Sequence, residues 1–313
     1  MSNSPENGIV ILNYNTFEDT VRCVDSIFKY TSDIADCSIY IVDNASPDGS
    51  GNLLKAHFQD NSSIQTIFSE RNLGFSSGNN LGIRQALEDG CGKVFLLNSD
   101  IYLTNDAIGI MSEKLDSDED IVAIGPAVFN TKGTYIQFAR KALTFKDHLA
   151  ERMPMLGDKQ VRRIPYDQKK DFVFSGMSSG CCFGLKTDFV KSNKLLDDHI
   201  FMYYEEDILA HQIINAEKKA CICADARIIH NEASSTKKTV HGRASFERMH
   251  RWASALYVLK EYGGISDGQK RFLYDTNLME WKTLSIWHIE YRDRYRQFKR
   301  LLDEYMNKRS SIR

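Results

Sequence analysis

Short apolar runs alternate with amphipathic segments through the first third of the chain, and this alternation constrains the fold more than any other feature. The first run, at 8–12, is rich in β-branched residues and stops at Asn13, which is typical of a strand buried on both faces. Apolar side chains then recur at helical spacing over residues 17–30, and a second strand is expected at 37–46. This β-α-β order predicts an α/β fold.

The alternation continues beyond the second strand. Helices are expected at about 51–58 and 78–88, and strands at about 64–68 and 93–97. Such an order favours a mostly parallel central sheet flanked by helices, because parallel neighbours need helical crossovers. A later strand is expected to end at His230, whereas residues 130–170 lose periodicity and are expected to form a surface excursion over the sheet.

Composition supports a folded, soluble chain. Of the 313 residues, 42% are hydrophobic and 26% are charged, which excludes a disordered protein. No window approaches the about 18 uncharged apolar residues of a membrane-spanning helix. Because the first residues also lack the pattern of a secretory signal, we expect a cytoplasmic location. The seven cysteines include no CxxC pair and are expected to be reduced and mostly buried.

Positive charge is concentrated at the end of the chain. Residues 236–313 contain 17 Lys and Arg against 9 Asp and Glu, so the preceding residues carry a net negative charge. We therefore expect two parts, a 1–235 α/β domain and a 236–313 region of two or three basic amphipathic helices broken at Gly263 and Gly264. Interspersed acidic residues favour solvated helix faces and argue against nucleic-acid binding.

Polar residues follow three of the expected strands, at 13–15, 43–46 and 98–100. In a parallel sheet, ligands bind at the carboxyl ends of the strands, so these stretches are candidate site residues. Asp43 alone is better explained by a cap or turn, and the alternative for Asp100 is a helix cap near Thr104. When the Asp43 and Asp100 carboxylates are considered together, their place at the same edge of one sheet favours a ligand-binding site.

Asp100 suits a hard divalent cation, because Mg²⁺ prefers oxygen ligands and commonly takes one or two protein carboxylates. His230 is a candidate further ligand, since imidazole also suits Mn²⁺, although a lone histidine is more often structural. The stretch 71–80 contains two glycines that let the backbone approach a ligand closely. It is not the GxGxxG fingerprint, and no such fingerprint follows the first strand, which argues against a nicotinamide-dependent oxidoreductase.

Three adjacent carboxylates stand at Glu205, Glu206 and Asp207 after two tyrosines. Their mutual repulsion is expected to raise the pKa of at least one of them. Such a carboxylate suits general-base catalysis, and a solvated acidic helix start is an equally good explanation of this segment alone.

Taken in order, several of these stretches resemble the family 2 glycosyltransferases of the GT-A fold, with the rhamnosyltransferase-like branch the most similar. The resemblance rests on NYN at 13–15, VDNAS at 42–46, NLGFSSGNN at 72–80, LLNSD at 96–100, the small-residue stretch at 175–185 and FMYYEED at 201–207. It covers about residues 8–235. It implies transfer of a sugar, with inversion, from a nucleoside diphosphate donor to an acceptor hydroxyl on a growing bacterial surface glycan such as O-antigen or capsule.

The resemblance also implies roles for individual residues. Nucleoside binding falls on Asn13, Tyr14, Asn15 and Asp43, and the diphosphate and ribose pocket on Asn72, Gly78 and Asn79. The family's DxD position falls on Asn98, Ser99 and Asp100, with Asn in place of the first Asp, so Asp100 is expected to carry most of the contact with Mg²⁺ or Mn²⁺. The donor is expected to be dTDP- or UDP-linked.

The family's base falls on Glu206, with Glu205 and Asp207 as neighbours that leave the register open by one residue. Ile208 and Gln212 replace an Asp and an Arg of the family pattern. The departures at Asn98 and Ile208 leave a second hypothesis, a sugar-nucleotide-binding protein without catalysis. The basic tail is compatible with a homodimer contact, an extended acceptor site, or peripheral contact with the inner membrane, where a lipid-linked glycan acceptor would be found.

Overall fold

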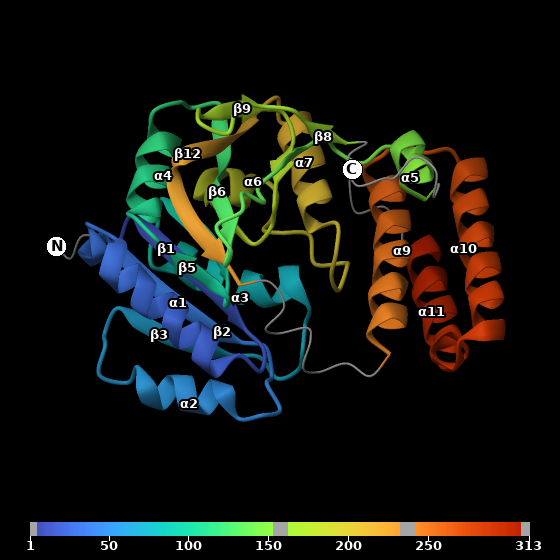
Figure 1. Ribbon diagram of the computed structural model, residues 1–313, viewed down its shortest axis with the longest axis horizontal. Coiled ribbons are helices and arrows are strands. Elements are labelled where there is room, and N and C mark those ends of the chain that lie inside the picture. The colour runs from blue at the N-terminus through green and yellow to red at the C-terminus, as the bar shows by residue number, and fades with distance from the viewer. Residues whose placement is uncertain (1–4, 153–161, 232–241, 308–313) are drawn as a thin grey trace.

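The computed structural model describes residues 5–152, 162–231 and 242–307 (Figure 1). The strands are β1 (Asn7–Asn13), β2 (Cys37–Asp43), β3 (Ile64–Phe68), β4 (Lys93–Asn98), β5 (Ile101–Leu103), β6 (Ile121–Asn130), β7 (Ala139–Arg140), β8 (Arg163–Ile164), β9 (Phe172–Phe174), β10 (Met177–Ser178), β11 (Cys182–Lys186) and β12 (Lys219–His230). The helices are α1 (Phe17–Tyr30), α2 (Ser50–His57), α3 (Phe75–Glu88), α4 (Ala107–Asp116), α5 (Phe145–Arg152), α6 (Thr187–Ser192), α7 (Glu205–Asn215), α9 (Arg243–Glu261), α10 (Asp267–Trp287) and α11 (Ile289–Asn307), with a short 3₁₀ turn at Ile34–Asp36.

The central sheet confirms the predicted α/β fold. Over the described ranges it has nine strands in the order β3-β2-β1-β4-β11-β6-β12-β5, with β9 beside β12. The first four strands in that order are parallel, as are β6 and β12. Strands β11, β5 and β9 run antiparallel to their neighbours, which makes the sheet mixed. The predicted helix at 78–88 begins three residues earlier, at Phe75.

Strand β1 is buried on both faces, as its apolar run predicts. Ile9 and Ile11 pack into one core with residues of α1 and α4. Val10, between them, points to the other face and packs with Ile83 of α3. The alternation of successive side chains across a strand produces this division. Helices therefore cover both faces of the sheet, and the polar ends of its strands lie at the edge (Figure 1).

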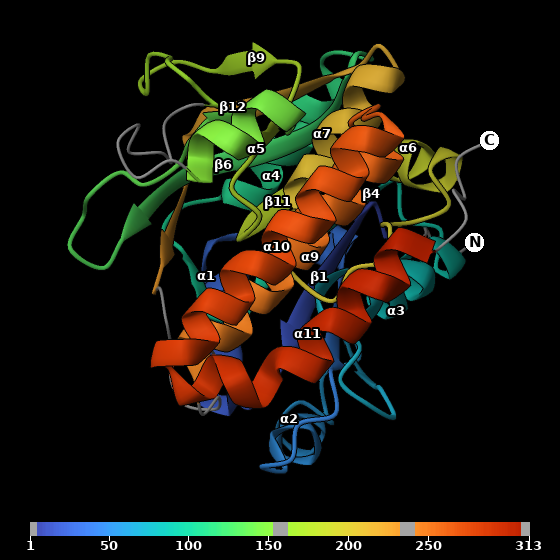
Figure 2. The same cartoon turned by 90° about the vertical axis from the view of Figure 1, so that its right-hand side faces the viewer.

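Residues 130–170, expected as a surface excursion, contain regular structure. Strand β7 pairs with β8 and β10 in a small three-stranded sheet, and helix α5 follows β7. Figure 2 shows α5 beside the C-terminal helices. This small sheet and α5 therefore link the central sheet to the C-terminal helices.

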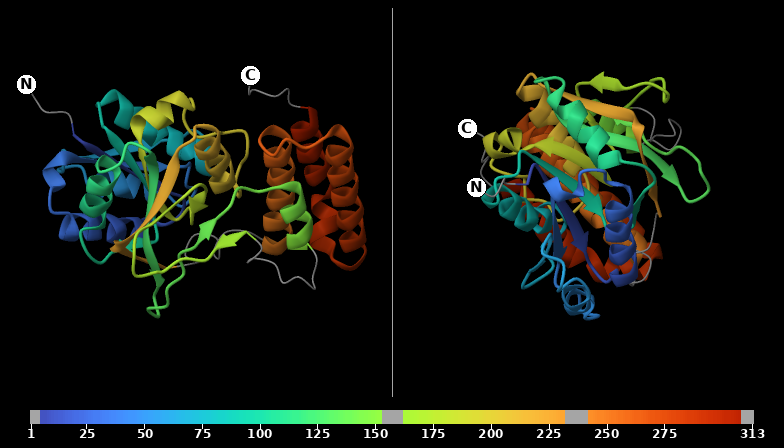
Figure 3. Two further views of the ribbon diagram at one scale, coloured as in Figure 1. Left: turned by 90° about the horizontal axis from the view of Figure 1, so that it is seen from above. Right: turned by 90° about the vertical axis from the view of Figure 1, so that its left-hand side faces the viewer.

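Helices α9, α10 and α11 pack together around the fully buried Trp281, whose ring stacks on Phe298 at 4.2 Å between centroids. They lie as a group beside the central sheet (Figure 3). The predicted break at Gly263 and Gly264 is confirmed, with Gly264 in the left-handed region at φ 61°. No helix in the described part of the chain has the length and apolar character needed to cross a bilayer. The predicted domain boundary at 235/236 lies outside the described residues.

All seven cysteines are buried and free of disulfide bonds, as predicted from their spacing. Several lie in the core against α1 and α4, where a thiol behaves as a small apolar side chain.

Candidate active site

The carboxyl ends of β1 and β2 place Asn13 directly opposite Asp43. Asn13 Nδ2 donates a hydrogen bond to Asp43 Oδ1 at 2.7 Å, and Asn13 Oδ1 accepts from Thr16 and Thr20. Asn13 has no exposed surface, so the direct nucleoside contact that the resemblance implies stays a prediction. The position of Asn13 fixes the orientation of the Asp43 carboxylate.

Asp43 is also nearly buried, at 4% exposure. Its Oδ2 accepts from the Ser46 backbone N–H at 3.2 Å, so the turn considered for this residue is present. Tyr14 and Asn15 are half-buried at the same edge, and Asn15 has a left-handed backbone at φ 59°. The two residues therefore remain candidates for nucleoside contact.

The stretch between β3 and α3 is tied to β2 through Asn44. Asn44 Nδ2 donates to Asn72 Oδ1 at 3.1 Å and to the Gly74 carbonyl at 3.0 Å. Asn72 is half-buried, whereas Asn79 is 1% exposed and its Oδ1 has no hydrogen-bond partner in the described structure. The Asn79 Oδ1 atom is thus an unused acceptor near this stretch.

Gly78 has a packing role besides its predicted place in the diphosphate pocket. A Cβ at this position would lie 2.7 Å from Leu12 Cδ1 of β1. The glycine therefore allows α3 to pack closely on the sheet.

Strand pairing brings Asp100 and His230 together although 130 residues separate them in sequence. His230 lies opposite Ile101 in the β12–β5 pair, and the Asn231 N–H donates to the Asp100 carbonyl at 3.0 Å. The Asp100 Oδ1 to His230 Nε2 distance is 3.3 Å. The alternative role of Asp100 as a helix cap is wrong, because Asp106 caps α4.

Asp100 and His230 fit a shared divalent cation. Two ligands at right angles on an ion with bonds of about 2.1 Å lie about 3 Å apart, close to the observed separation. Burial lowers the pKa of His230, but hydrogen bonds to Asp100 and Cys181 outweigh burial and raise it to about 10. Without a metal, His230 is therefore protonated at neutral pH, and a metal ion would displace that proton.

Asn98 and Ser99 complete the DxD-like stretch with different surroundings. Ser99 is 5% exposed and its Oγ accepts from Thr16 Oγ1 at 2.9 Å, so it helps to hold the β4 end against α1. Asn98 is half-buried, and its backbone N–H donates to the Cys181 carbonyl at 2.9 Å.

The acidic segment begins with a strained turn. Tyr203 and Tyr204 both have left-handed backbone, at φ 68° and 73°, and α7 starts at Glu205. Left-handed non-glycine residues cost free energy and cluster at functional sites. The turn places the three acids in the first turn of α7, where the helix dipole favours negative charge.

Asp207 is buried at 2% exposure and forms an ion pair with Arg162. Arg162 also binds Glu151 at 2.6 Å. Burial raises the pKa of Asp207 to about 6, although the nearby arginine opposes this change. The ion pair holds this carboxylate inside the protein.

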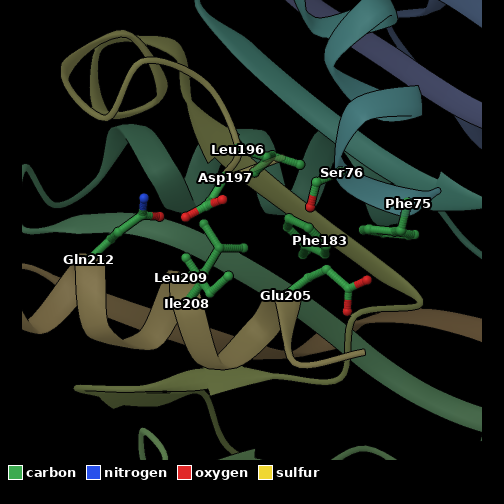
Figure 4. A pocket seen from close by; sticks show the side chains of 9 residues that line it. All are labelled: Phe75, Ser76, Phe183, Leu196, Asp197, Glu205, Ile208, Leu209 and Gln212. Atoms are coloured by element: carbon green, nitrogen blue, oxygen red, sulfur yellow. The ribbon is translucent and has the colours of Figure 1, made fainter. Parts of the chain in front are cut away.

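Glu205 lies beside apolar side chains, as the close-up shows (Figure 4). Phe75 and Phe183 line the same small pocket, which also contains Ile208 and Gln212. Burial, followed by repulsion from Glu206, raises the pKa of Glu205 to about 8. Glu205 is therefore mostly protonated at neutral pH.

Glu206 is half-buried and lines a cleft of about 590 Å³. The Gly180 backbone N–H donates to Glu206 Oε1 at 3.1 Å, and a Cβ at Gly180 would lie 2.4 Å from that oxygen. The next residue, Cys181, contacts His230. The Gly180–Cys181 dipeptide therefore connects Glu206 to the Asp100–His230 pair.

The sequence reasoning missed the basic wall of this cleft. Its lining includes Arg140, Arg152, Arg162, Arg163, Arg251 and Trp252. The mixture of basic and aromatic residues at 130–170 was the available signal, but only the fold brings that stretch and α9 to the acidic segment. Another acidic group, Asp197 with Asp198 and His199, was also not predicted. Tyr257 of α9 and Tyr262, which directly follows that helix, both donate to Asp197 Oδ2, which indicates a structural tether.

The chain is similar in sequence to known glycosyltransferases. The family described as "Glycosyl transferase family 2" matches residues 8–191. The low-salt glycan biosynthesis hexosyltransferase Agl10 of Haloferax volcanii is 24% identical over 225 residues, which cover 72% of this chain and 66% of that protein.

Solved structures share the fold. GalNAc-T7, solved with UDP, GalNAc and Mn²⁺, aligns with a TM-score of 0.61 and 15% identity, over 99% of this chain and 56% of that one. The mannosyltransferase PcManGT of Pyrobaculum calidifontis, solved with GDP-Man and Mn²⁺, aligns with a TM-score of 0.56 and 11% identity, over 97% of this chain and 86% of that one. The fold is thus that of GT-A enzymes, and the chain belongs to glycosyl transferase family 2.

Proposed function

We propose that this protein is a metal-dependent inverting glycosyltransferase that uses a nucleoside diphosphate sugar as donor. The observation that supports this most strongly is the Gly180–Cys181 dipeptide, whose first residue binds Glu206 of the cleft and whose second residue contacts His230 of the Asp100–His230 pair. Two structural neighbours were solved with UDP and Mn²⁺ and with GDP-Man and Mn²⁺, which supports a metal and a nucleotide sugar. We favour a UDP- or dTDP-linked donor and Mg²⁺ or Mn²⁺.

Asp100 and His230 would hold the cation, which supplies positive charge for the diphosphate that leaves. Asp43, oriented by Asn13, and the half-buried Tyr14 and Asn15 would bind the nucleoside. Asn72 would contact the ribose or diphosphate side of the donor, and the unused Asn79 Oδ1 would accept a hydrogen bond from a ribose hydroxyl.

Glu206 is the base in this proposal. It accepts the proton of the acceptor hydroxyl while that oxygen forms a bond to the anomeric carbon and the bond to the diphosphate breaks on the opposite face, which inverts the carbon. Asp207 is held by Arg162, and Glu205 is protonated at neutral pH, so neither is as well suited to accept a proton.

Glu206→Gln tests this assignment. The amide keeps the shape but cannot accept the proton, so we expect transfer to fall about 10²–10⁴-fold. Donor binding should persist, as measured by the Mn²⁺-dependent rise of the thermal midpoint with UDP, dTDP or GDP. The matched control is Glu113→Gln, an exposed glutamate of α4. Near-normal transfer by Glu206→Gln would refute the role of Glu206. Donor binding by the wild type without transfer to any acceptor would favour the non-catalytic alternative.

The acceptor is proposed to be a glycan or lipid-linked glycan of a cell-surface polymer, reached at the cytoplasmic face of a membrane. The corner between α10 and α11 exposes Ile286, Trp287 and Ile289, at 72%, 81% and 65%. Exposed Trp beside Lys and Arg is typical of interfacial membrane contact. Co-sedimentation with anionic vesicles at low salt should detect this membrane contact, and Trp287→Ser should weaken it. Self-association that is seen by analytical ultracentrifugation and lost in that variant would favour a homodimer.

A further inference from the structure

The cleft beside Glu206 holds more positive charge than its own acids neutralise. Five arginines line it, and two of them have acidic partners: Arg162 binds Asp207 and Glu151, and Arg152 binds Glu280 at 2.6 Å. The other three make no ion pair with a carboxylate of the described chain; they are Arg140, Arg163 and Arg251. An arginine beside other cations is more stable when an anion joins it.

Arg140 and Arg163 lie directly opposite each other in the β7–β8 pair. Like charges at such positions repel and weaken strand pairing. Both guanidinium groups lie over the Phe138 ring, at 4.5 and 5.2 Å from its centroid. The aromatic ring partly offsets the repulsion, but the two positive charges remain together at the wall of the cleft.

Arg251 reaches the cleft from a different element, helix α9. Its guanidinium lies 4.7 Å from the centroid of the Tyr203 ring, in the strained turn that immediately precedes Glu205 and Glu206. The three arginines therefore approach the acidic segment from two walls. Glu205 adds little negative charge between them, because its pKa of about 8 keeps it mostly protonated.

We propose that this cleft binds an acceptor that carries a phosphoryl group, and that Arg140, Arg163 and Arg251 hold that group beside the hydroxyl that Glu206 deprotonates. This inference rests on the proposed function and specifies its acceptor. The donor diphosphate does not explain these arginines, since in the proposed function its counter-charge would be the cation that Asp100 and His230 would hold. Arginine is the residue best suited to such a role, because its planar fork can make two hydrogen bonds to one phosphate.

The first test uses inorganic pyrophosphate as a probe of the full chain, in EDTA so that no metal loads the donor site. We expect pyrophosphate to raise the thermal midpoint of the wild type and to lose this effect in Arg140→Ala/Arg163→Ala and in Arg251→Ala. Arg163→Glu is a second variant, chosen because Arg163 is exposed and its replacement is compatible with folding. Arg84→Ala, an exposed arginine of α3 outside the cleft, is the control and should respond like the wild type. No response in the wild type, or an undiminished response in the double variant, would overturn the proposal.

The second test compares three acceptors that share one sugar: a neutral alkyl glycoside, an alkyl-diphosphoryl sugar and a soluble sugar phosphodiester. We expect kcat/KM to be at least about 10-fold higher for one of the phosphorylated acceptors, as one charge-assisted hydrogen bond is worth about that factor. Preference for the alkyl diphosphate identifies a lipid-linked source, and preference for the phosphodiester identifies a polymer. Arg140→Ala/Arg163→Ala should raise the KM for that acceptor and leave the KM for the donor unchanged.

Equal use of the neutral acceptor, with the double variant unaffected, would refute a phosphoryl subsite while leaving the glycosyltransferase proposal intact. Pyrophosphate binding at the arginines without any nucleotide binding or transfer would have the opposite meaning, because it would support the anion site and refute the proposed function.

Discussion

Replacing Glu205 with Gln should change how the stability of the protein depends on pH. The pKa of Glu205 is raised from an ordinary value of 4.5 to about 8, chiefly by burial and then by repulsion from Glu206. Between these two pH values the folded chain binds more protons than the unfolded chain. The free energy of unfolding therefore falls as the pH rises from 4.5 to 8, and the contribution of the neutral group is fully present only below pH 4.5.

The size of the effect follows from the two pKa values. The difference between them corresponds to a change in the free energy of unfolding of at most about 5 kcal/mol, since each pH unit contributes about 1.4 kcal/mol. Glu205 retains partial exposure, and Glu206 can relax away from it, so we expect the free energy of unfolding to change by about 2 kcal/mol. The free energy of unfolding of Glu205→Gln, relative to that of the wild type, should thus rise by about 2 kcal/mol between pH 4.5 and 8.5.

Urea unfolding followed by circular dichroism at pH 4.5, 6.5 and 8.5 measures this difference, and the titration of other groups cancels between wild type and variant. Glu113→Gln, at an exposed position of α4, should show a constant difference from wild type over the same range. Parallel curves for Glu205→Gln and wild type would refute the reasoning. They would mean that Glu205 is ionised in the folded protein and competes with Glu206 for the role of base.

Two further predictions concern the surroundings of the acidic segment. Gly180→Ala should lower transfer about 100-fold with nucleotide binding retained, because the new methyl group would lie 2.4 Å from Glu206 Oε1 and displace it; unchanged kcat would contradict this. Arg162→Met should lower the free energy of unfolding by about 3–5 kcal/mol at pH 7.5, because it leaves the buried Asp207 without its partner. Urea unfolding measures this loss of stability. The loss should be smaller near pH 5, because Asp207, with its pKa of about 6, is already protonated there. An equal loss at both pH values would argue against an ionised Asp207.

Local patterns in the sequence determined the strands and helices of the first hundred residues. The apolar run of β1 and the single apolar face of α1 predict their own structure, because burial of one face depends on spacing along the chain. The same patterns predict that Asp43 and Asp100 lie at the carboxyl ends of strands of one sheet, and these strands, β2 and β4, flank β1. The order of motifs identifies the family. These features need no knowledge of which distant segments meet.

The tertiary structure decided what each polar residue contacts. Asn13 and Gly78 match the family motif, yet one is buried as the partner of Asp43 and the other allows α3 to pack on β1. Spacing along the chain carries no information on such burial. Likewise only the pairing of β12 with β5 brings His230 to Asp100, and only the placement of β7, β8 and α9 brings arginines to the acid cleft. The sequence by itself determined the fold class, the family and a set of candidate residues, because those depend on local periodicity and motif order. The structure separated binding, catalytic and packing roles, because those depend on neighbours far away along the chain.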